Sequence, residues 1–353
     1  MAGIEFESPS YIKKIQFSKQ QARLLDLGSR QTAAVGGPDA TGAAAISAHH
    51  AKSLKSSMDT RQLDIIESFS CGKAAAVEFI AMQPPSLDPI PESLPTIAII
   101  STDPITLYLA SRNQILLNLV NYRSFAFDID NGSKQVRLVG NFKGGGENLL
   151  ADELKYTEAE LSSHSGVKLG PHTEPPYNCA VKSEGEHSPA PSALILTARW
   201  NPLHEPTRLI PVRSVVAKLN GLEALALSSK SFCFTRSDCF VKDDSKKMVE
   251  NSILQFDPRG EFTLRYSSYR YSLLNEADQS TRQAYHSLQR LLKEAKSYTF
   301  QLHPGSALLI NNNQTLHARE IIKDNRRLLI RLFGYSPDAQ PLIWQQDPLV
   351  VRD

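Results

Sequence analysis

The stretch that decides the fold lies near the C-terminal end of the chain and reads HPGSALLINNNQTLHAREIIKDNRRLLIRLFGY, residues 303–335. A Pro-Gly turn signal opens it, and the apolar run Ala307–Asn311 that follows predicts a buried strand. A polar loop separates this strand from a second extended segment that begins near His317. The run Arg327–Tyr335 predicts a third strand. Short strands joined in this way are typical of a β-sandwich or barrel rather than of alternating strands and helices.

The rest of the chain beyond Arg123 continues this pattern of short apolar or alternating runs bounded by turn residues. Two helical stretches interrupt it, at Val212–Ser229 and Ser280–Lys296. Further strands are predicted at Ser124–Ile129, Val136–Val139, Ala193–Ala198, Ser231–Phe234 and Gly260–Ser267.

The first hundred residues read mostly as helices. The segment Gly36–Ser56 is rich in Ala, Gly and Ser and has no clear period, so we expect a mobile surface segment there. Helices are predicted at Lys19–Ser29, Thr60–Phe69, Ala74–Met82 and, further on, Ile105–Leu119.

A proline-rich stretch, Pro84–Pro95, provides the best domain boundary. We therefore expect a helical extension in residues 1–100, packed on a core formed by residues 101–340. Residues 341–353 are expected to be a C-terminal tail.

The composition excludes several classes of protein. The 353 residues include 39 Lys plus Arg and 37 Asp plus Glu, a net charge of +2, which offers no broad basic surface for nucleic acid or an anionic membrane. The four cysteines form no CxxC pair, which indicates reduced thiols rather than disulfides or a zinc ribbon.

The chain shows no signal peptide and no apolar run near ~20 residues, so we expect a cytoplasmic protein. Neither GxGxxG nor GxxxxGK[ST] is present.

The triplet His172-Thr173-Glu174 is a candidate metal-binding pair. In an extended segment, residues i and i+2 project to the same side, so the imidazole and the carboxylate can converge on one ion. With nine histidines in the chain, about one HxD/E triplet is expected by chance. A surface histidine beside a surface glutamate is therefore the alternative interpretation.

Two arginines are expected on one face of the predicted strand Arg327–Tyr335. Arg327 and Arg331 are four residues apart and point alike in a strand that otherwise looks suited to burial. Buried arginines are costly unless they meet anions. A pair of internal salt bridges is the alternative to a site for an anionic ligand.

The combination of HxE, a long gap, PGxxLLIxN…LHxR and RRxxxR resembles the clavaminate synthase-like branch of the taurine dioxygenase superfamily. These are non-haem iron(II), 2-oxoglutarate-dependent oxygenases. The resemblance covers roughly Arg123 to Tyr335 and is strongest at HTEPPYN (His172–Asn178) and from Leu302 to Tyr335. It implies a mainly β fold with helical decoration, built on a double-stranded β-helix (jelly roll), with a lid insertion around residues 240–275.

The resemblance also implies a set of cofactor-binding residues. His172, Glu174 and His317 match the 2-His-1-carboxylate triad, which holds Fe(II) and leaves sites for 2-oxoglutarate and O₂. Arg327 matches the arginine that binds the distal carboxylate of 2-oxoglutarate, and Thr207 matches a hydroxyl that assists it. Because the carboxylate ligand is present, a halogenase is disfavoured.

Three further residues match positions that contact the substrate in similar enzymes. Arg331 corresponds to the arginine that meets the substrate's acidic group, and Ser162 and Asn141 fall where polar contacts occur. Arg265 and Arg270 lie where arginine-selective enzymes carry acidic side chains, which argues against a guanidinium substrate. The alternative is that Ser162 and Asn141 are turn formers.

The activity that the resemblance implies is hydroxylation of an unactivated C–H bond of a free L-amino acid or close derivative, with release of succinate and CO₂. The expected partner is thus a small, amino-acid-like molecule. Three alternatives stay open: a dioxygenase for a sulfonate or other small organic acid, a zinc hydrolase on the same three ligands, and a metal-binding jelly roll without turnover.

Overall fold

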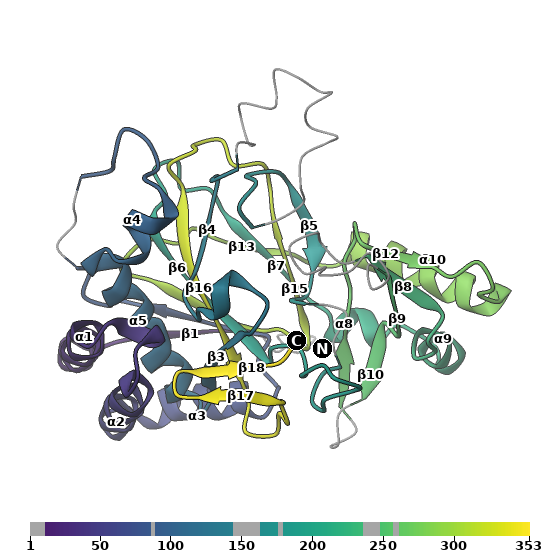
Figure 1. Cartoon of the computed structure of the whole chain (residues 1–353). Helices are drawn as coiled ribbons and strands as arrows, with labels where there is room; N and C mark the ends of the chain where they lie inside the picture. Colours follow the sequence, from purple (N-terminus) through teal and green to yellow (C-terminus); the bar gives the residue numbers. More distant parts are fainter. Residues whose placement is uncertain (1–10, 86–88, 144–162, 176–178, 236–247, 257–260) are drawn as a thin grey trace, which may run out of the picture.

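The structure is a computed structural model that describes residues 11–85, 89–143, 163–175, 179–235, 248–256 and 261–353 (Figure 1). Within these ranges no helix is long and apolar enough to cross a membrane. The helices are α1 (Lys19–Ala34), η1 (Gly37–Asp39), α2 (Ala43–Ser56), α3 (Thr60–Ser70), α4 (Ile97–Ser101), α5 (Pro104–Leu119), η2 (Asn131–Ser133), α8 (Arg213–Val216), α9 (Gly221–Leu227) and α10 (Gln279–Glu294).

The described strands form two larger and two smaller sheets. A nine-stranded sheet has the order β1-β2-β14-β6-β16-β3-β18-β17, with β4 also paired to β16, and a four-stranded sheet has the order β13-β7-β15-β5. The smaller sheets are β12-β8-β9 and β10-β11. The bounds are β1 (Ile12–Gln16), β2 (Ala76–Ile80), β3 (Arg123–Phe127), β4 (Arg137–Gly140), β5 (Leu169–His172), β6 (Ala193–Trp200), β7 (Thr207–Pro211), β8 (Phe232–Thr235), β9 (Met248–Asn251), β10 (Leu254–Phe256), β11 (Phe262–Leu264), β12 (Tyr271–Leu273), β13 (Tyr298–Phe300), β14 (Ala307–Asn311), β15 (Thr315–Arg319), β16 (Leu328–Tyr335), β17 (Ile343–Gln346) and β18 (Leu349–Val351).

The two larger sheets enclose a shared apolar core. In β6, Leu194 and Leu196 belong to this core, together with Leu308 of β14 in the same sheet and Leu209 of β7 in the four-stranded sheet. The intervening Ile195 instead packs with the helices. Since side chains alternate along a strand, both faces of the nine-stranded sheet are buried.

Helices cover the outer faces of both sheets (Figure 1). One cluster joins Leu25 of α1, Leu54 of α2 and Leu117 of α5 to the nine-stranded sheet. A second cluster joins Leu288 of α10 to Leu316 of β15 in the four-stranded sheet. The order of layers is therefore helices, large sheet, small sheet, helices.

The alternation along β16 decides where its arginines lie. Ile330 packs beneath the helices, whereas Leu329 belongs to the core between the sheets. Arg327 and Arg331 are two residues away from Leu329 on either side and therefore share its face. Both side chains are buried between the two larger sheets.

The same alternation applies to β15. Leu316 lies in the outer cluster beneath α10. Its neighbour His317, and Arg319 two residues further on, therefore face the interior. Charged and polar groups of both sheets thus meet in an otherwise apolar core.

Most of the predicted elements are confirmed. Every strand predicted beyond Arg123 overlaps an observed strand, and α1, α3, α5 and α10 occupy the predicted helices. The single helix predicted at Val212–Ser229 is instead two, α8 and α9. The break falls before Asn220, whose side chain accepts a hydrogen bond from the Glu223 backbone N–H and caps α9.

The helix predicted at Ala74–Met82 is wrong, because this segment forms β2. It pairs in parallel with β1 and antiparallel with β14. Ala76 packs between the sheets while Val77 and Phe79 pack beneath the helices. A strand with both faces buried reads as a continuous apolar run, which periodicity does not separate from a helix. The first hundred residues are therefore not purely helical.

The mobile segment predicted at Gly36–Ser56 is also wrong, because it contains η1 and α2. The buried face of α2 consists of Ala43, Ser47, Ala51 and Leu54, which recur at helical spacing. Three of these four residues are small, so the hydrophobic periodicity of this segment is weak. The small side chains nevertheless allow α2 to pack closely against α1 and α5.

Two further predictions concern the C-terminus and the cysteines. The predicted tail at residues 341–353 contains a hairpin, β17–β18, whose second strand pairs in parallel with β3. Cys71, Cys179 and Cys233 are free thiols, as expected, and Cys239 lies outside the described residues.

The position of β2 makes a testable prediction about stability. Phe79 is fully buried and stacks on Phe17 with 5.8 Å between ring centroids, so Phe79→Ala should destabilise the protein by about 3–5 kcal/mol. Glu78→Gln, which removes only an ion pair with a largely exposed lysine, should cost less than about 1 kcal/mol. Urea unfolding measures both, and equal effects would contradict this placement of β2.

Candidate metal centre

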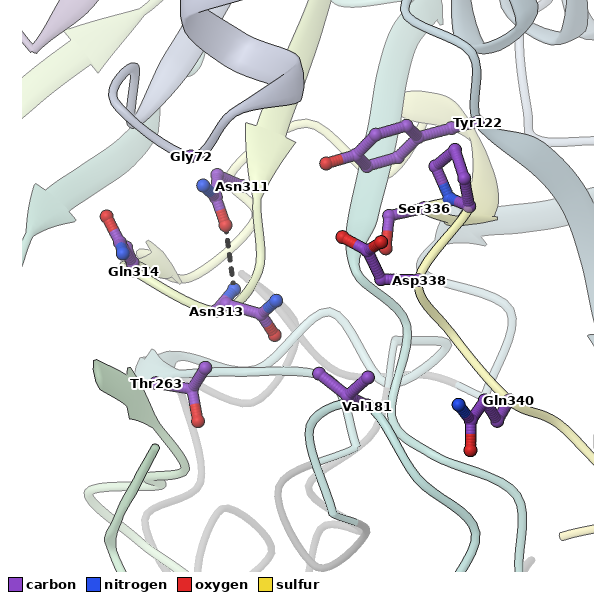
Figure 2. Close-up of a pocket in the computed structure, with 11 residues that line it drawn as sticks. Gly72, Tyr122, Val181, Thr263, Asn311, Asn313, Gln314, Ser336, Asp338 and Gln340 are labelled. Atoms are coloured by element: carbon purple, nitrogen blue, oxygen red, sulfur yellow. Dashed lines mark hydrogen bonds between the residues drawn. The ribbon is translucent and has the colours of Figure 1, made fainter. Parts of the chain in front are cut away.

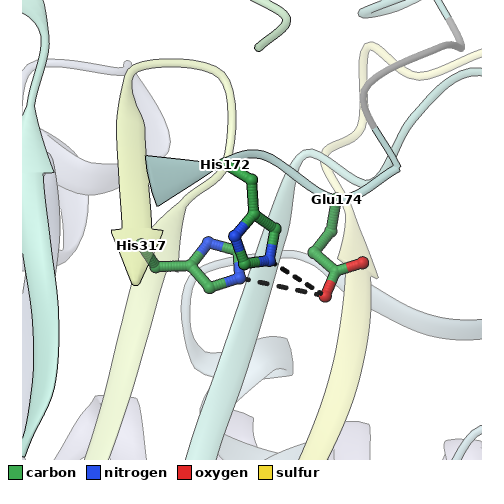
Figure 3. A group of neighbouring side chains, drawn as sticks. All are labelled: His172, Glu174 and His317. Atoms are coloured by element: carbon green, nitrogen blue, oxygen red, sulfur yellow. Dashed lines mark ion pairs between the residues drawn. The ribbon is translucent and has the colours of Figure 1, made fainter. Parts of the chain in front are cut away.

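Two imidazoles and one carboxylate meet between the sheets (Figure 3). His172 ends β5 and lies directly opposite His317 of β15 in the antiparallel register, with 4.2 Å between the ring centroids. Glu174 follows two residues after His172. The candidate ligand atoms of the three residues all lie within 4.8 Å of one another. The structure thus brings together all three residues of the predicted triad.

The distances within this group suit a shared ion. Glu174 Oε1 lies 3.8 Å from Nε2 of His172 and 3.8 Å from Nε2 of His317. These separations are too long for hydrogen bonds. Two ligands that each lie about 2.1 Å from one metal are at most about 4.2 Å apart, so both separations fall within that limit.

The protonation states leave these atoms available as ligands. His172 Nδ1 lies 2.7 Å from the Gly170 carbonyl, which only accepts hydrogen bonds, so Nδ1 donates to it and Nε2 is the candidate ligand atom. Burial, reinforced by His172, lowers the pKa of His317 to about 4. Its imidazole is therefore neutral at pH 7.

Glu174 is negatively charged at neutral pH. Burial would raise its pKa, but Arg331 and the two imidazoles bring the pKa well below its usual value. The donor set is thus two imidazoles and one carboxylate. This set fits a non-haem Fe(II) centre, whereas closed structural zinc sites usually contain thiolates.

Arg331 is bonded to the proposed metal ligand itself. Its Nη1 donates to Glu174 Oε1 over 2.6 Å, and its guanidinium lies 4.1 Å from the centroid of the Phe333 ring. The alternative of an internal salt bridge is therefore realised for Arg331. Its buried Nε has no hydrogen-bond partner, so it keeps a donor for a further acceptor.

Arg327 has no such partner. Its side chain is 1% exposed, and its Nε and Nη1 are buried without hydrogen-bond partners. In the part of the chain that the structure describes, Arg327 makes no ion pair. Burial lowers its pKa to about 10, so the guanidinium remains charged at pH 7. Thr207 lines the same cavity. A buried cation with two unpartnered donor nitrogens favours an anionic ligand.

Two neighbours of the triad had no role in the sequence analysis. Arg319 lines the cavity, and its Nη2 donates to the Val167 carbonyl over 2.7 Å. The sequence could have indicated this position, because Arg319 follows His317 by two residues and residues i and i+2 of a strand share a face. Tyr269 contacts His172 edge-on, with 5.6 Å between the ring centroids, and no pattern in the sequence indicated that contact.

The described residues that line the cavity do not include the two predicted polar contacts of the substrate, Ser162 and Asn141. Ser162 lies outside the described residues. Asn141 is not among the described residues that line the cavity; its Nδ2 donates to Asn325 Oδ1 over 2.6 Å.

The two arginines that were expected near the substrate lie elsewhere. Arg265 is fully buried with Nη2 bonded to Asn313, and Arg270 donates to the Thr235 carbonyl. Neither lines the cavity, so the sequence argument that these arginines repel a guanidinium substrate is not supported.

A larger hollow of about 380 Å³ lies at the turn between β14 and β15 (Figure 2). Asn311 and Asn313 line it, with Tyr122 and Asp338 on another side. Asp338 is the one carboxylate among its described lining residues, and none of them is a histidine or cysteine. A metal site of the predicted type therefore belongs to the smaller cavity between the sheets.

One segment of the chain matches a known protein family. The family model described as "Taurine catabolism dioxygenase TauD, TfdA family" matches residues 235–333. That range includes His317, Arg327 and Arg331. No curated protein matches the sequence.

Solved structures of iron oxygenases share the fold. An asparagine oxygenase in complex with Fe(II), 2S,3S-3-hydroxyasparagine and succinate is 17% identical, with a TM-score of 0.66, over 96% of this chain and 99% of that one. The non-heme iron oxygenase OrfP with Fe and alpha-ketoglutaric acid is 16% identical, with a TM-score of 0.62, over 92% and 94% of the chains. The family match to residues 235–333, together with this shared fold, confirms the resemblance to the taurine dioxygenase superfamily.

The convergence of the triad predicts metal-dependent stabilisation. Under anaerobic conditions, Fe(II) should raise the Tm of the wild-type protein, because ligand at 100 times its Kd adds about 2.7 kcal/mol to the free energy of unfolding. His317→Ala should abolish this increase, whereas His286→Ala, on the exposed face of α10, should preserve it. Differential scanning fluorimetry measures the shift, and an equal increase in all three proteins would refute the site.

Proposed function

We propose that this chain is an Fe(II)/2-oxoglutarate-dependent dioxygenase that hydroxylates a C–H bond of a free L-amino acid or close derivative. The observation that carries the proposal is the combination, in one cavity, of the His172–Glu174–His317 group and the unpaired guanidinium of Arg327. A metal site alone suits many functions. A metal site beside a cationic clamp suits a reaction in which an anionic cosubstrate binds at the metal.

We further propose that the nine- and four-stranded sheets form a double-stranded β-helix. The fold shared with the iron oxygenases supports this assignment. The oxygenase core would comprise residues 101–340 together with β1 and β2, which are part of the larger sheet. The strands β9, β10, β11 and β12 lie in the part of the chain, around residues 240–275, where we place the lid.

His172, Glu174 and His317 would hold the iron. With 2-oxoglutarate and O₂, bound Fe(II) supplies the oxidation of an unactivated C–H bond, and succinate and CO₂ are released. The protein residues bind and orient the reactants. Arg327 offers the distal carboxylate of 2-oxoglutarate a guanidinium with two unpartnered nitrogens, and the Thr207 hydroxyl lies on the same cavity wall.

Arg331 would connect the metal ligand to the substrate. Its Nη1 holds Glu174, and its free Nε would donate to the acidic group of the substrate. Ser162 and Asn141 remain the predicted polar contacts of the substrate. The structures of OrfP and asparagine oxygenase that contain hydroxylated arginine and asparagine support an amino acid as the substrate class.

A sulfonate or other small organic acid is the second candidate substrate. Arg319, Arg327 and Arg331 all line the cavity, while Glu174 is the one carboxylate among the described lining residues. This surplus of positive charge favours substrates with at least one acidic group. It also argues against a metal-binding protein without turnover, which needs no site for anions.

The activity itself is tested by succinate release. Purified enzyme with Fe(II), O₂ and 2-oxoglutarate should release succinate above its basal rate with at least one member of a panel of L-amino acids and sulfonates. His317→Ala should lose this stimulation, and His286→Ala should retain it. Turnover without O₂ or 2-oxoglutarate would instead indicate a hydrolase.

The role of Arg327 is tested by the affinity for 2-oxoglutarate. In the Fe(II)-loaded protein without O₂, Arg327→Ala should weaken 2-oxoglutarate binding at least about 10-fold, because a charge-assisted hydrogen bond contributes about 1.5–3 kcal/mol. Arg326→Ala is the matched control, since its guanidinium is partly exposed and pairs with Asp324. Isothermal titration calorimetry measures both, and equal affinities would disprove the assignment.

A further inference from the structure

Three consecutive asparagines form the turn that leads from β14 into β15, and they differ in what they contact. Asn311 and Asn313 line the hollow shown in Figure 2. Asn312 lies between them, is fully buried, and contacts the segment that carries Glu174. The sequence alone predicts one polar loop for all three.

The side-chain amide of Asn312 holds the backbone of Glu174 on both sides. Its Oδ1 accepts a hydrogen bond from the Glu174 backbone N–H over 2.9 Å, and its Nδ2 donates to the Glu174 carbonyl over 2.5 Å. The same Nδ2 donates to the Pro191 carbonyl over 2.8 Å. A primary amide has one acceptor and two donor hydrogens, and all three functions are used here.

Asn312 also connects the two halves of the metal centre. It precedes His317 by five residues on the same turn-and-strand unit, and its own backbone N–H donates to the Ser192 carbonyl over 3.0 Å. On the other side of the triplet, the Thr173 backbone N–H donates to the Tyr266 carbonyl over 2.9 Å. The backbone of Glu174 is therefore held on both sides by Asn312, and the preceding residue, Thr173, is anchored separately to Tyr266.

We propose that Asn312 is the positioning residue for the Glu174 carboxylate, and that it sets this ligand against His172 and His317. The identity of the metal in this inference rests on the proposed function. Loss of the amide would release the backbone of the carboxylate ligand while the histidines stay fixed by the β5–β15 register. Outer partners that orient metal ligands typically change metal affinity by about 10–100-fold.

A matched control exists elsewhere in the chain. Asn201 makes the same three kinds of bond: Oδ1 accepts from the Glu205 backbone N–H, and Nδ2 donates to the carbonyls of Glu205 and Leu302. It too is buried, at 9% exposure. Asn312→Ala and Asn201→Ala therefore remove equal sets of hydrogen bonds, one from the backbone of a candidate metal ligand and one from the backbone of Glu205, which is not a candidate ligand.

The experiment measures the Kd for Fe(II) by anaerobic calorimetry and the Tm of the metal-free proteins. Both variants should lose roughly 2–8 °C in Tm. Asn312→Ala should bind Fe(II) at least about 10-fold more weakly than wild type, whereas Asn201→Ala should stay within about twofold. If Asn312→Ala does not fold, Asn312→Ser, which is also too short to make all three bonds, replaces it with the same expectation.

A double variant tests whether Asn312 acts through Glu174. In a Glu174→Ala background, adding Asn312→Ala should change the Fe(II) affinity by less than about twofold, because no carboxylate remains to be positioned. A full additional loss in the double variant, or wild-type affinity in Asn312→Ala, would overturn the inference. Failure of the wild-type protein to bind Fe(II) would instead overturn the proposed function.

Discussion

The antiparallel register between β5 and β15 is the constraint on which the candidate site depends. It places His172 opposite His317, although 144 residues separate them in the chain. Because side chains alternate, a slip of one residue would turn His317 outward to the layer beneath α10 and bring Leu316 inside. The packing of Leu316 against α10 therefore stabilises the orientation of a metal ligand on the opposite face of the same strand.

The cavity between the sheets is lined by more positively than negatively charged side chains. Three arginines and one glutamate line a cavity whose other walls include Leu194, Leu196 and Leu329. Burial lowers the pKa of Arg319 to about 9 and that of Arg327 to about 10, yet both remain protonated at neutral pH. Glu174 pairs with Arg331, and Arg327 makes no ion pair with another described residue. An anionic cosubstrate would supply a counter-charge for Arg327.

Much of this arrangement was predictable from local patterns. The strands that carry the site have strong signals, since Ala307–Asn311 and Arg327–Tyr335 are apolar runs with turns at their ends. The HxE triplet alone is a weak indication, and only its combination with LHxR and RRxxxR indicates the triad. The resemblance to a family, rather than the spacing alone, linked these distant segments.

What escaped prediction depends on tertiary contacts. β2 is buried on both faces and so reads like a helix, while α2 buries mainly small residues and has a weak hydrophobic period. The ion pair of Arg331 with Glu174 and the three bonds of Asn312 join segments far apart in sequence. No local pattern distinguishes Asn312 from Asn311 and Asn313, because only the folded chain shows which amide meets Glu174.

The most direct measurement of the central claim is anaerobic absorption spectroscopy of the protein with Fe(II) and 2-oxoglutarate. We expect a visible metal-to-ligand charge-transfer band that saturates at one iron and one 2-oxoglutarate per chain and that disappears in a folded His317→Ala variant. Absence of the band in the wild-type protein, or an unchanged band in that variant, would contradict a ferrous centre held by His172, Glu174 and His317.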